Sequence, residues 1–201
     1  MPGFQSTRLV TEGALEPFFF LYTDDSIQGN PETCKQSNVM LNYEVKNSQC
    51  AINGRVYTHE KEIDWLNAGL RAFYLEYELQ RGKTMEELAN TSPDPGRTAI
   101  QENLKLQMDF ENKDIPFGYP VLNGQGIEPS MIKVYPVKPG DEILLASDGY
   151  PVLRGTLAES EKELQRILEE DPLCFRTYRS TKGKKSCNVS FDDRTYCRIL
   201  V

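Results

Sequence analysis

Helical and strand-like patterns are grouped along this sequence instead of alternating, and that grouping limits the folds open to it. Apolar and polar residues alternate over 39–45 and 131–137, and 142–146 is a short apolar run, as in β-strands. Between the first two stretches, residues 60–81 carry apolar side chains at three- and four-residue steps, as in an amphipathic helix. Alternating strands and helices would indicate a parallel sheet, whereas grouped elements indicate antiparallel strands. The sequence therefore predicts an α+β fold with antiparallel sheet.

Turn residues define a hairpin and the end of the long helix. Asn53-Gly54 predicts a hairpin turn within 49–57, because both residues accept positive φ. Gly82 is expected to end the helix. The helix is expected to bury one apolar stripe, which consists of Ile63, Leu66, Leu70, Phe73 and Tyr77. The aromatic residues of this helix are likewise expected in the core: Trp65, Phe73, Tyr74 and Tyr77.

Two capping boxes mark the starts of further helices. Thr84–Glu87 and Thr156–Glu159 place Thr and Glu three residues apart, so that each side chain can bond the other's backbone N–H. The second of these helices is expected to run to about residue 170. Another helix is expected over 98–110, with Asp94–Arg97 before it as a turn. Two more strands are expected, at Phe18–Tyr22 and Thr195–Val201.

Length and charge restrict the class of protein. The 201 residues fit a single domain, with 1–38 as a loosely patterned lead and 39–201 as its body. The formal net charge of −7 argues against a nucleic-acid partner, which would require a basic face. The longest apolar run is too short to cross a bilayer, so no membrane association is expected.

Cysteine and histidine content indicate the compartment and disfavour zinc. The five cysteines are odd in number and form no Cys-x-x-Cys pair, which favours reduced thiols in a cytoplasmic protein. A zinc site is disfavoured because His59 is the only histidine and no ligand pair has the usual spacing.

Two acidic signatures stand beside strand-like runs in the C-terminal third. Asp148 follows 142–146 and is itself followed by Gly149, and Asp192-Asp193 precedes the last expected strand. Carboxylates at neighbouring strand ends can share one hard divalent cation, because Mg²⁺ and Mn²⁺ prefer oxygen ligands. Each signature also fits an ordinary turn, in which Asp bonds its own backbone. Both interpretations remain open from the local sequence.

The longer strings around these signatures resemble one family. Lys138–Gly149 is similar to the "pro-gly-asp, hydrophobic strand, ser-asp-gly" segment of the metal-dependent (type 2C, PPM) Ser/Thr protein phosphatases. Asp192–Thr195 resembles the family's closing "asp-asn-x-thr" signature, with Asp193 in place of the more usual Asn. The resemblance covers about residues 117–201 and extends loosely back to Val45.

The resemblance implies both a fold and a chemistry. Members of the family form an αββα sandwich of two antiparallel sheets flanked by helices, with two Mn²⁺ or Mg²⁺ ions at one end. A metal-bound water attacks the phosphorus of phosphoserine or phosphothreonine. Carried over by position, Asp148 and Asp192 would ligate one metal ion. Further candidate ligands are Asp193, Asp24 and Asp25.

The N-terminal half departs from the family pattern. The family's early Asp-Gly pair, whose Asp bridges both metals, has no counterpart before Asp148. The nearest candidate is the apolar run that ends at Asp24-Asp25, and Lys46-Asn47 stand where the family has Gly-Asp. The early phosphate-contacting Arg would have only Arg8 as a counterpart, and one helical layer is missing. The expectation is therefore a truncated αββα sandwich with one metal site.

Three functions remain open from the sequence. The first is metal-dependent hydrolysis of a phosphoprotein, with Arg97 at a helix start as a candidate substrate-binding residue. The second is a non-catalytic regulatory module on the same scaffold, which would bind a protein partner. The third, a nuclease that uses the same carboxylates, is disfavoured by the acidic charge. A basic segment over 176–185 is expected to be a solvated loop, with attraction of substrate phosphate as the alternative.

Overall fold

The computed structural model describes residues 37–41, 48–58, 61–121, 123–185 and 188–201, and for 37–41 it describes the backbone. The strands are β1 (Ser37–Leu41), β2 (Gln49–Ile52), β3 (Arg55–Thr58), β4 (Lys133–Val137), β5 (Glu142–Ala146) and β6 (Tyr196–Leu200). The helices are α1 (Glu62–Gln80), α2 (Met85–Asn90), α3 (Pro95–Ala99), α4 (Gln101–Leu106) and α5 (Leu157–Glu170). Two 3-10 turns are η1 (Gln107–Phe110) and η2 (Pro129–Met131). Several residues singled out from the sequence lie outside this description: Arg8, Phe18–Tyr22, Asp24, Asp25, Lys46, Asn47 and His59.

The strands form antiparallel ladders, which confirms the α+β prediction. One sheet has the order β3-β2-β5-β6, and β1 pairs with β4 in a separate ladder. The β2–β3 turn lies at Asn53 and Gly54, with φ of 50° and 79°, as the Asn-Gly pair predicts. The Asn53 side chain also accepts the backbone N–H of Glu142 at 2.9 Å. This contact fixes the hairpin against the first residue of β5.

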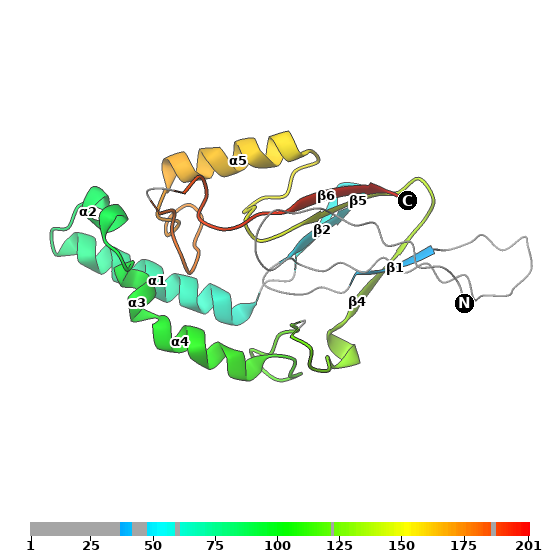
Figure 1. Ribbon diagram of the computed structural model, residues 1–201, viewed down its shortest axis with the longest axis horizontal. Helices are drawn as coiled ribbons and strands as arrows, with labels where there is room; N and C mark the ends of the chain where they lie inside the picture. Colours follow the sequence, from blue (N-terminus) through cyan, green and yellow to red (C-terminus); the bar gives the residue numbers. More distant parts are fainter. Residues whose placement is uncertain (1–36, 42–47, 59–60, 122, 186–187) are drawn as a thin grey trace, which may run out of the picture.

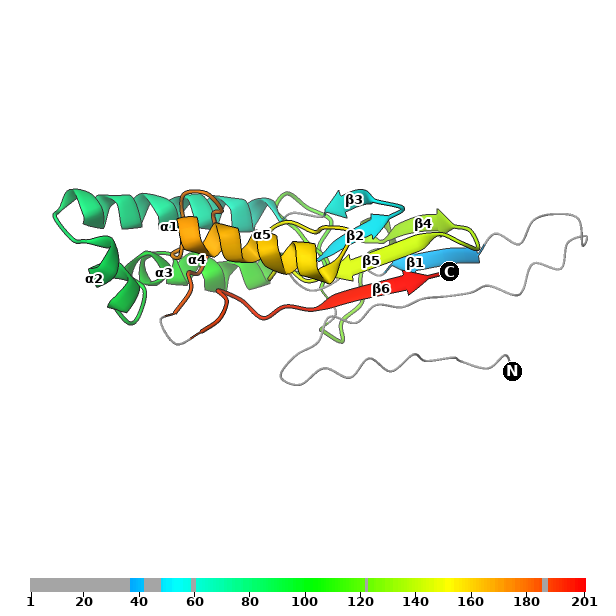
Figure 2. The ribbon, with the colours of Figure 1, turned by 90° about the horizontal axis from the view of Figure 1, so that it is seen from above.

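Both faces of the four-stranded sheet are covered, and β5 lies at its centre. On one face, Leu144 and Ala146 contact Leu164 and Leu168 of α5. On the other face, Ile143 and Leu145 contact Val137 of β4. Successive residues of a strand point to opposite faces, so a strand buried on both sides reads as a continuous apolar run. Figures 1 and 2 show α5 over one side of β5 and β6, with β4 on the other.

Capping residues set the helix starts largely as the sequence predicts. Thr84 and Thr156 each form a complete capping box, with Glu87 and Glu159, at the starts of α2 and α5. The single helix expected over 98–110 is divided in the structure into the end of α3, then α4 and the 3-10 turn η1. Asp94 is an N-cap whose carboxylate accepts the N–H of Arg97, and the helical segment starts at Pro95, as α3. The prediction of a turn over Asp94–Arg97 is therefore wrong, because a capped Asp-Pro pair favours a helix start.

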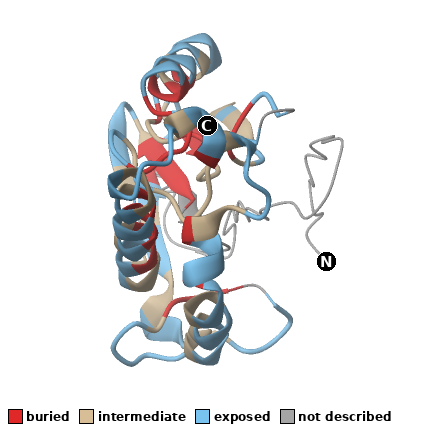
Figure 3. Cartoon of the chain, turned by 90° about the vertical axis from the view of Figure 1, so that its left-hand side faces the viewer, coloured by how far each residue is buried: buried red, intermediate tan, exposed pale blue. Residues whose placement is uncertain are grey.

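The orientation of α1 is the main correction to the sequence analysis. Its buried residues are Asn67, Ala68, Arg71, Ala72 and Leu75. Four of the five residues of the stripe expected in the core are exposed instead, namely Leu66, Leu70, Phe73 and Tyr77, and Ile63 is half-buried. Trp65 and Tyr74 are exposed as well, and the exposed fraction reaches 67% for Trp65 and 63% for Phe73. Small side chains bring the inner face of α1 close to its neighbours, and Arg71 fills that interface. Figure 3 shows buried residues on the inner sides of the helices and exposed ones on the outer sides.

Candidate functional site

The two acidic signatures lie side by side in the structure. Strands β5 and β6 are paired, with Ala146 opposite Tyr196. Beyond the pair, the backbone N–H of Ser147 donates to the carbonyl of Thr195 at 3.1 Å. The Ser147 hydroxyl in turn accepts the N–H of Thr195 at 2.9 Å. The Ser-Asp-Gly and Asp-Asp-Arg-Thr segments are therefore held together by one backbone hydrogen bond and by the Ser147 hydroxyl.

Gly149 allows the two signatures to approach this closely. A Cβ at this position would lie 2.2 Å from the carbonyl oxygen of Asp193 and 2.7 Å from Cβ of Arg194. The φ angle of Gly149 is not in the left-handed region, so close approach of the backbone is the reason for glycine here. A glycine follows Asp148 because the backbone at this position packs directly against Asp193 and Arg194 of the second signature.

Asp148 and Asp192 line one cavity of about 720 Å³. Its wall includes residues of β2, β3, α1, α3, α4 and the segment 177–182. Its charged residues are balanced, four basic and four acidic: Lys61, Arg97, Arg179, Lys182, Asp64, Glu111, Asp148 and Asp192. The cavity therefore brings together the carboxylates predicted as metal ligands and the predicted substrate residue Arg97.

Asp192 is already bonded within the protein. Its Oδ1 forms an ion pair with Nζ of Lys182 and accepts the backbone N–H of Asp193 at 2.9 Å. The Asp192 side chain is 16% exposed, so this ion pair is only partly accessible to water. Asp193 itself is exposed and lines a different hollow, together with Arg194 and Tyr196. Asp192 also lines this second hollow, so it borders both hollows, whereas Asp193 borders only the second.

The donor set does not fit a two-metal site among the described residues. No group of three or more His, Cys, Asp or Glu side chains suitable for a metal ion occurs in the part of the chain that the structure describes. Lys182 also supplies a positive charge to Asp192, where a cation would bind. The predicted further ligands Asp24 and Asp25 lie outside the described residues.

Arg97 reaches the cavity from the first turn of α3. Its backbone N–H donates to Oδ1 of Asp94 at 2.9 Å, which caps the helix. One of its guanidinium nitrogens donates to the carbonyl of Thr181 at 2.9 Å. The guanidinium therefore lies against the segment that carries Lys182. A guanidinium has five N–H donors in a fixed plane, a geometry that suits phosphate oxygens.

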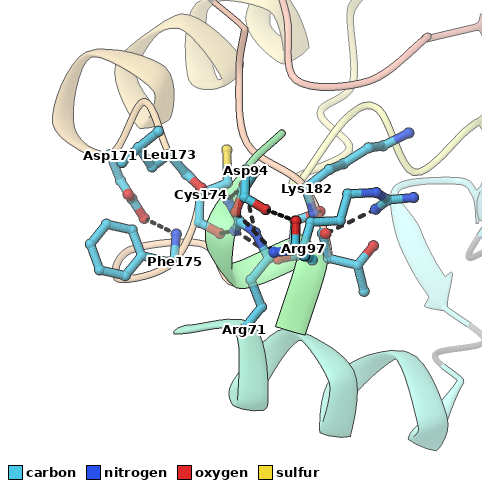
Figure 4. A network of polar contacts seen from close by, with 11 residues as sticks. Arg71, Asp94, Arg97, Asp171, Leu173, Cys174, Phe175 and Lys182 are labelled. Atoms are coloured by element: carbon cyan, nitrogen blue, oxygen red, sulfur yellow. Dashed lines mark hydrogen bonds and ion pairs between the residues drawn. The ribbon is translucent and has the colours of Figure 1, made fainter. Parts of the chain in front are cut away.

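A buried arginine holds this segment in place, and sequence analysis did not identify it. Arg71 is fully buried and donates to the carbonyls of Leu173, Cys174 and Ser180 at 2.9, 3.1 and 3.0 Å. It also donates to Oδ2 of Asp94 at 2.6 and 3.1 Å. Figure 4 shows this network between α1, the start of α3 and the 171–182 segment. The sequence does contain one indication of this role: Arg71 lies beside Ala68 and Ala72, on the side of α1 that carries the small residues.

Asp171 organises the same segment from its other end. Its Oδ2 accepts the backbone N–H groups of Phe175, Arg176 and Thr177 at 2.9, 2.6 and 2.9 Å. The basic segment predicted as a solvated loop is therefore an anchored loop, with a buried carboxylate at one end and Arg71 beneath it. This anchoring fixes the path of the chain toward Lys182.

A third polar cluster connects the second signature to α5. Glu161 accepts the hydroxyl of Tyr150 at 2.6 Å and two guanidinium contacts from Arg194 at 2.7 and 3.1 Å. The Arg194 guanidinium holds the pKa of Glu161 below its ordinary value. Burial and the bond to Glu161 raise the pKa of Tyr150 to about 12. Tyr150 is therefore a neutral hydrogen-bond donor that orients the residues after Asp148.

Comparisons with known proteins returned no relative. No family model, curated protein or solved structure matches this chain. Among the described helices, none combines the length and the apolar character that crossing a bilayer requires. Among the described residues, Cys174 and Cys197 are free thiols. Cys34 and Cys187 lie outside the described residues, so the prediction of reduced cysteines stays a prediction.

Proposed function

We propose that this protein is a phosphatase-like module that binds phosphorylated protein segments in the Asp148–Asp192 cavity without hydrolysing them. The proposal rests on the ion pair between Lys182 and Asp192. In it, the lysine ammonium supplies the positive charge at a carboxylate that a metal ion would supply in a metal-dependent phosphatase. The scaffold proposed is a shortened αββα sandwich, supported by the antiparallel sheet and by the contact of the two signatures.

The cavity offers donors that suit a phosphoryl group. Arg97 and Lys182 both line it, and Arg97 donates to the residue directly before Lys182. A phosphate dianion next to these two cations would form charge-assisted hydrogen bonds, which are about twice as strong as neutral ones. Because Asp192 is neutralised by Lys182, it repels such an anion less than an isolated carboxylate would.

The only tryptophan of the chain provides a direct binding assay. Trp65 lines the same cavity and is largely exposed, so its fluorescence reports on occupancy. Titration with a phosphoserine peptide should change the Trp65 emission, and the unphosphorylated peptide should not. Arg97→Gln and Lys182→Gln should each weaken binding at least tenfold. The control Arg166→Gln removes an exposed arginine of α5 that is ion-paired to Glu163 and should leave binding unchanged. Equal binding of both peptides would exclude the proposal.

A metal-dependent phosphatase is the second candidate, favoured by the presence of Asp148 and Asp192 in one cavity. Mn²⁺ or Mg²⁺ would bind through these carboxylates and supply an activated water for ester hydrolysis. The candidate predicts Mn²⁺-dependent release of phosphate from the phosphoserine peptide, lost in Asp148→Asn. Calorimetric titration with Mn²⁺ separates the two functions. Turnover together with two coupled metal sites would replace the binding proposal by the enzyme.

A further inference from the structure

Helix α1 has an apolar outer face that no described part of the chain covers. We define the outer face as Leu66, Leu70, Phe73, Tyr74 and Tyr77. Their exposed fractions range from 36% to 63%. Leu66, Leu70, Phe73 and Tyr77 are spaced by four, three and four residues, so they form one continuous stripe along the helix. Contiguous exposed apolar residues of this kind mark interaction surfaces, whereas scattered ones do not.

The stripe has the spacing of a helix–helix interface. Apolar residues that recur at alternating three- and four-residue steps form one line of side chains along the helix. These side chains insert between the residues of a second helix packed against it. The opposite side of α1 is already occupied by Ala68, Ala72 and Leu75 in the core. A helix that is apolar on two sides is typical of a helix buried between two layers. The structure provides one of these layers.

We infer that the second layer is the outer face of another copy of the same chain, packed antiparallel about a two-fold axis. The charges at the ends of α1 carry this choice. Glu62 lies in the first turn and Arg81 caps the C-terminal end, and both are exposed. An antiparallel arrangement that places Leu66 opposite Tyr77 of the partner subunit also places Glu62 near Arg81 of the partner subunit. The two-fold axis forms this opposite-charge pair twice.

The aromatic residues of the outer face are suited to such an interface. The Phe73 and Tyr74 rings contact each other edge to face, with centroids 5.6 Å apart. The guanidinium of Arg81 lies 5.7 Å from the centre of the Tyr77 ring. Rings held by such contacts lose little conformational entropy on association, and aromatic residues dominate the energetics of interfaces. Antiparallel packing also opposes the two helix dipoles favourably.

The expected dimer is reversible. Helix α1 has 19 residues, which gives a contact about 28 Å long. One helix face buries less than the roughly 800 Å² per partner of a standard interface. Micromolar dissociation is therefore expected, and the dimer should form and dissociate with protein concentration.

Sedimentation equilibrium of the full chain from roughly 1 to 300 µM brackets this affinity. The weight-average mass should rise from 22.9 kDa toward twice that value. Phe73→Glu should raise the dissociation constant at least tenfold. The matched control Leu106→Glu changes a residue of α4 with a similar exposed fraction, 59%, and should leave it unchanged. A wild-type chain that stays monomeric throughout, or equal effects of the two substitutions, would overturn the inference.

Charge reversal tests the antiparallel arrangement itself. Glu62→Lys and Arg81→Glu should each weaken the dimer, because each places like charges together at both ends. The double variant restores opposite charges and should recover most of the lost affinity. Folding of each variant is checked by circular dichroism. Failure of the double variant to recover would rule out this pairing, even if the chain dimerises.

Discussion

Replacing Arg71 by methionine tests whether the buried network holds the cavity wall. Methionine keeps most of the length of the side chain and removes its charge and donors. The substitution deletes five hydrogen bonds: two to Asp94 and three to the carbonyls of Leu173, Cys174 and Ser180. It leaves these carbonyls and a partly buried carboxylate without their charged partner.

The expected cost is about 3–5 kcal/mol, the range for removing one partner of a buried ion pair. A domain is stable by only about 5–15 kcal/mol, so this loss is a large fraction of the total. With a urea m-value of about 2 kcal/mol per M, the unfolding midpoint should fall by roughly 1.5–2.5 M. Equilibrium urea unfolding, followed by circular dichroism, measures this shift. Arg71→Lys should be intermediate, because an ammonium cannot reach four acceptors in one plane.

Arg176→Met is the matched control. Arg176 is also ion-paired, to Glu76, but its side chain is 51% exposed. An exposed pair of this kind contributes at most about 1 kcal/mol. A cost of Arg71→Met no larger than that of Arg176→Met would refute the structural role assigned to the network. Limited proteolysis adds a local test: cleavage within 176–185 should accelerate in Arg71→Met before global unfolding does.

Three further substitutions test the contacts around the two signatures and α5. Gly149→Ala should cost about 1–3 kcal/mol in urea unfolding, because the new methyl group overlaps the Asp193 backbone, whereas Gly126→Ala, which meets no atom within 4 Å, should cost little. Glu161→Gln should flatten the acid limb of stability against pH: the pKa of Glu161 is lowered from 4.5, so its contribution is present above pH 4.5 and is lost as pH falls through the lowered pKa. Thr156→Ala removes the cap of α5 and should cost about 1 kcal/mol, measured as a lower thermal midpoint.

Elements with strong local signals could be predicted from the sequence. Strand β5 and helix α5 have the bounds that the apolar run and the capping box at Thr156–Glu159 indicate. The Asn53-Gly54 hairpin is likewise confirmed. Each of these depends on neighbouring residues, whose preferences act over a few positions. The pairing of β5 with β6 places the two signatures at neighbouring strand ends, the arrangement that a shared cation site would require.

The direction of α1 could not be predicted from periodicity, because this helix is apolar on two sides. Sequence periodicity favoured the side with the larger residues, led by Leu70 and Phe73. The structure buries the side with Ala68, Ala72 and Arg71. Small residues permit close packing, and the buried guanidinium satisfies carbonyls that are about 100 positions away in the sequence. Only the tertiary path of the 171–182 segment makes Arg71 a favourable core residue.

The same path explains why sequence analysis identified Asp192 but not its partner. Lys182 follows Ser180 and Thr181, whose carbonyls accept hydrogen bonds from Arg71 and Arg97. The backbone that carries the ammonium is thus fixed from α1 and α3, independently of the carboxylate. Forming the ion pair with Asp192 therefore costs little loop entropy, because the backbone of Lys182 is already in place. More of the attraction between the two charges then contributes to stability. A ligand for Asp192 must compete with a cation that the fold holds in place, which favours an anion that binds Lys182 over a metal ion that displaces it.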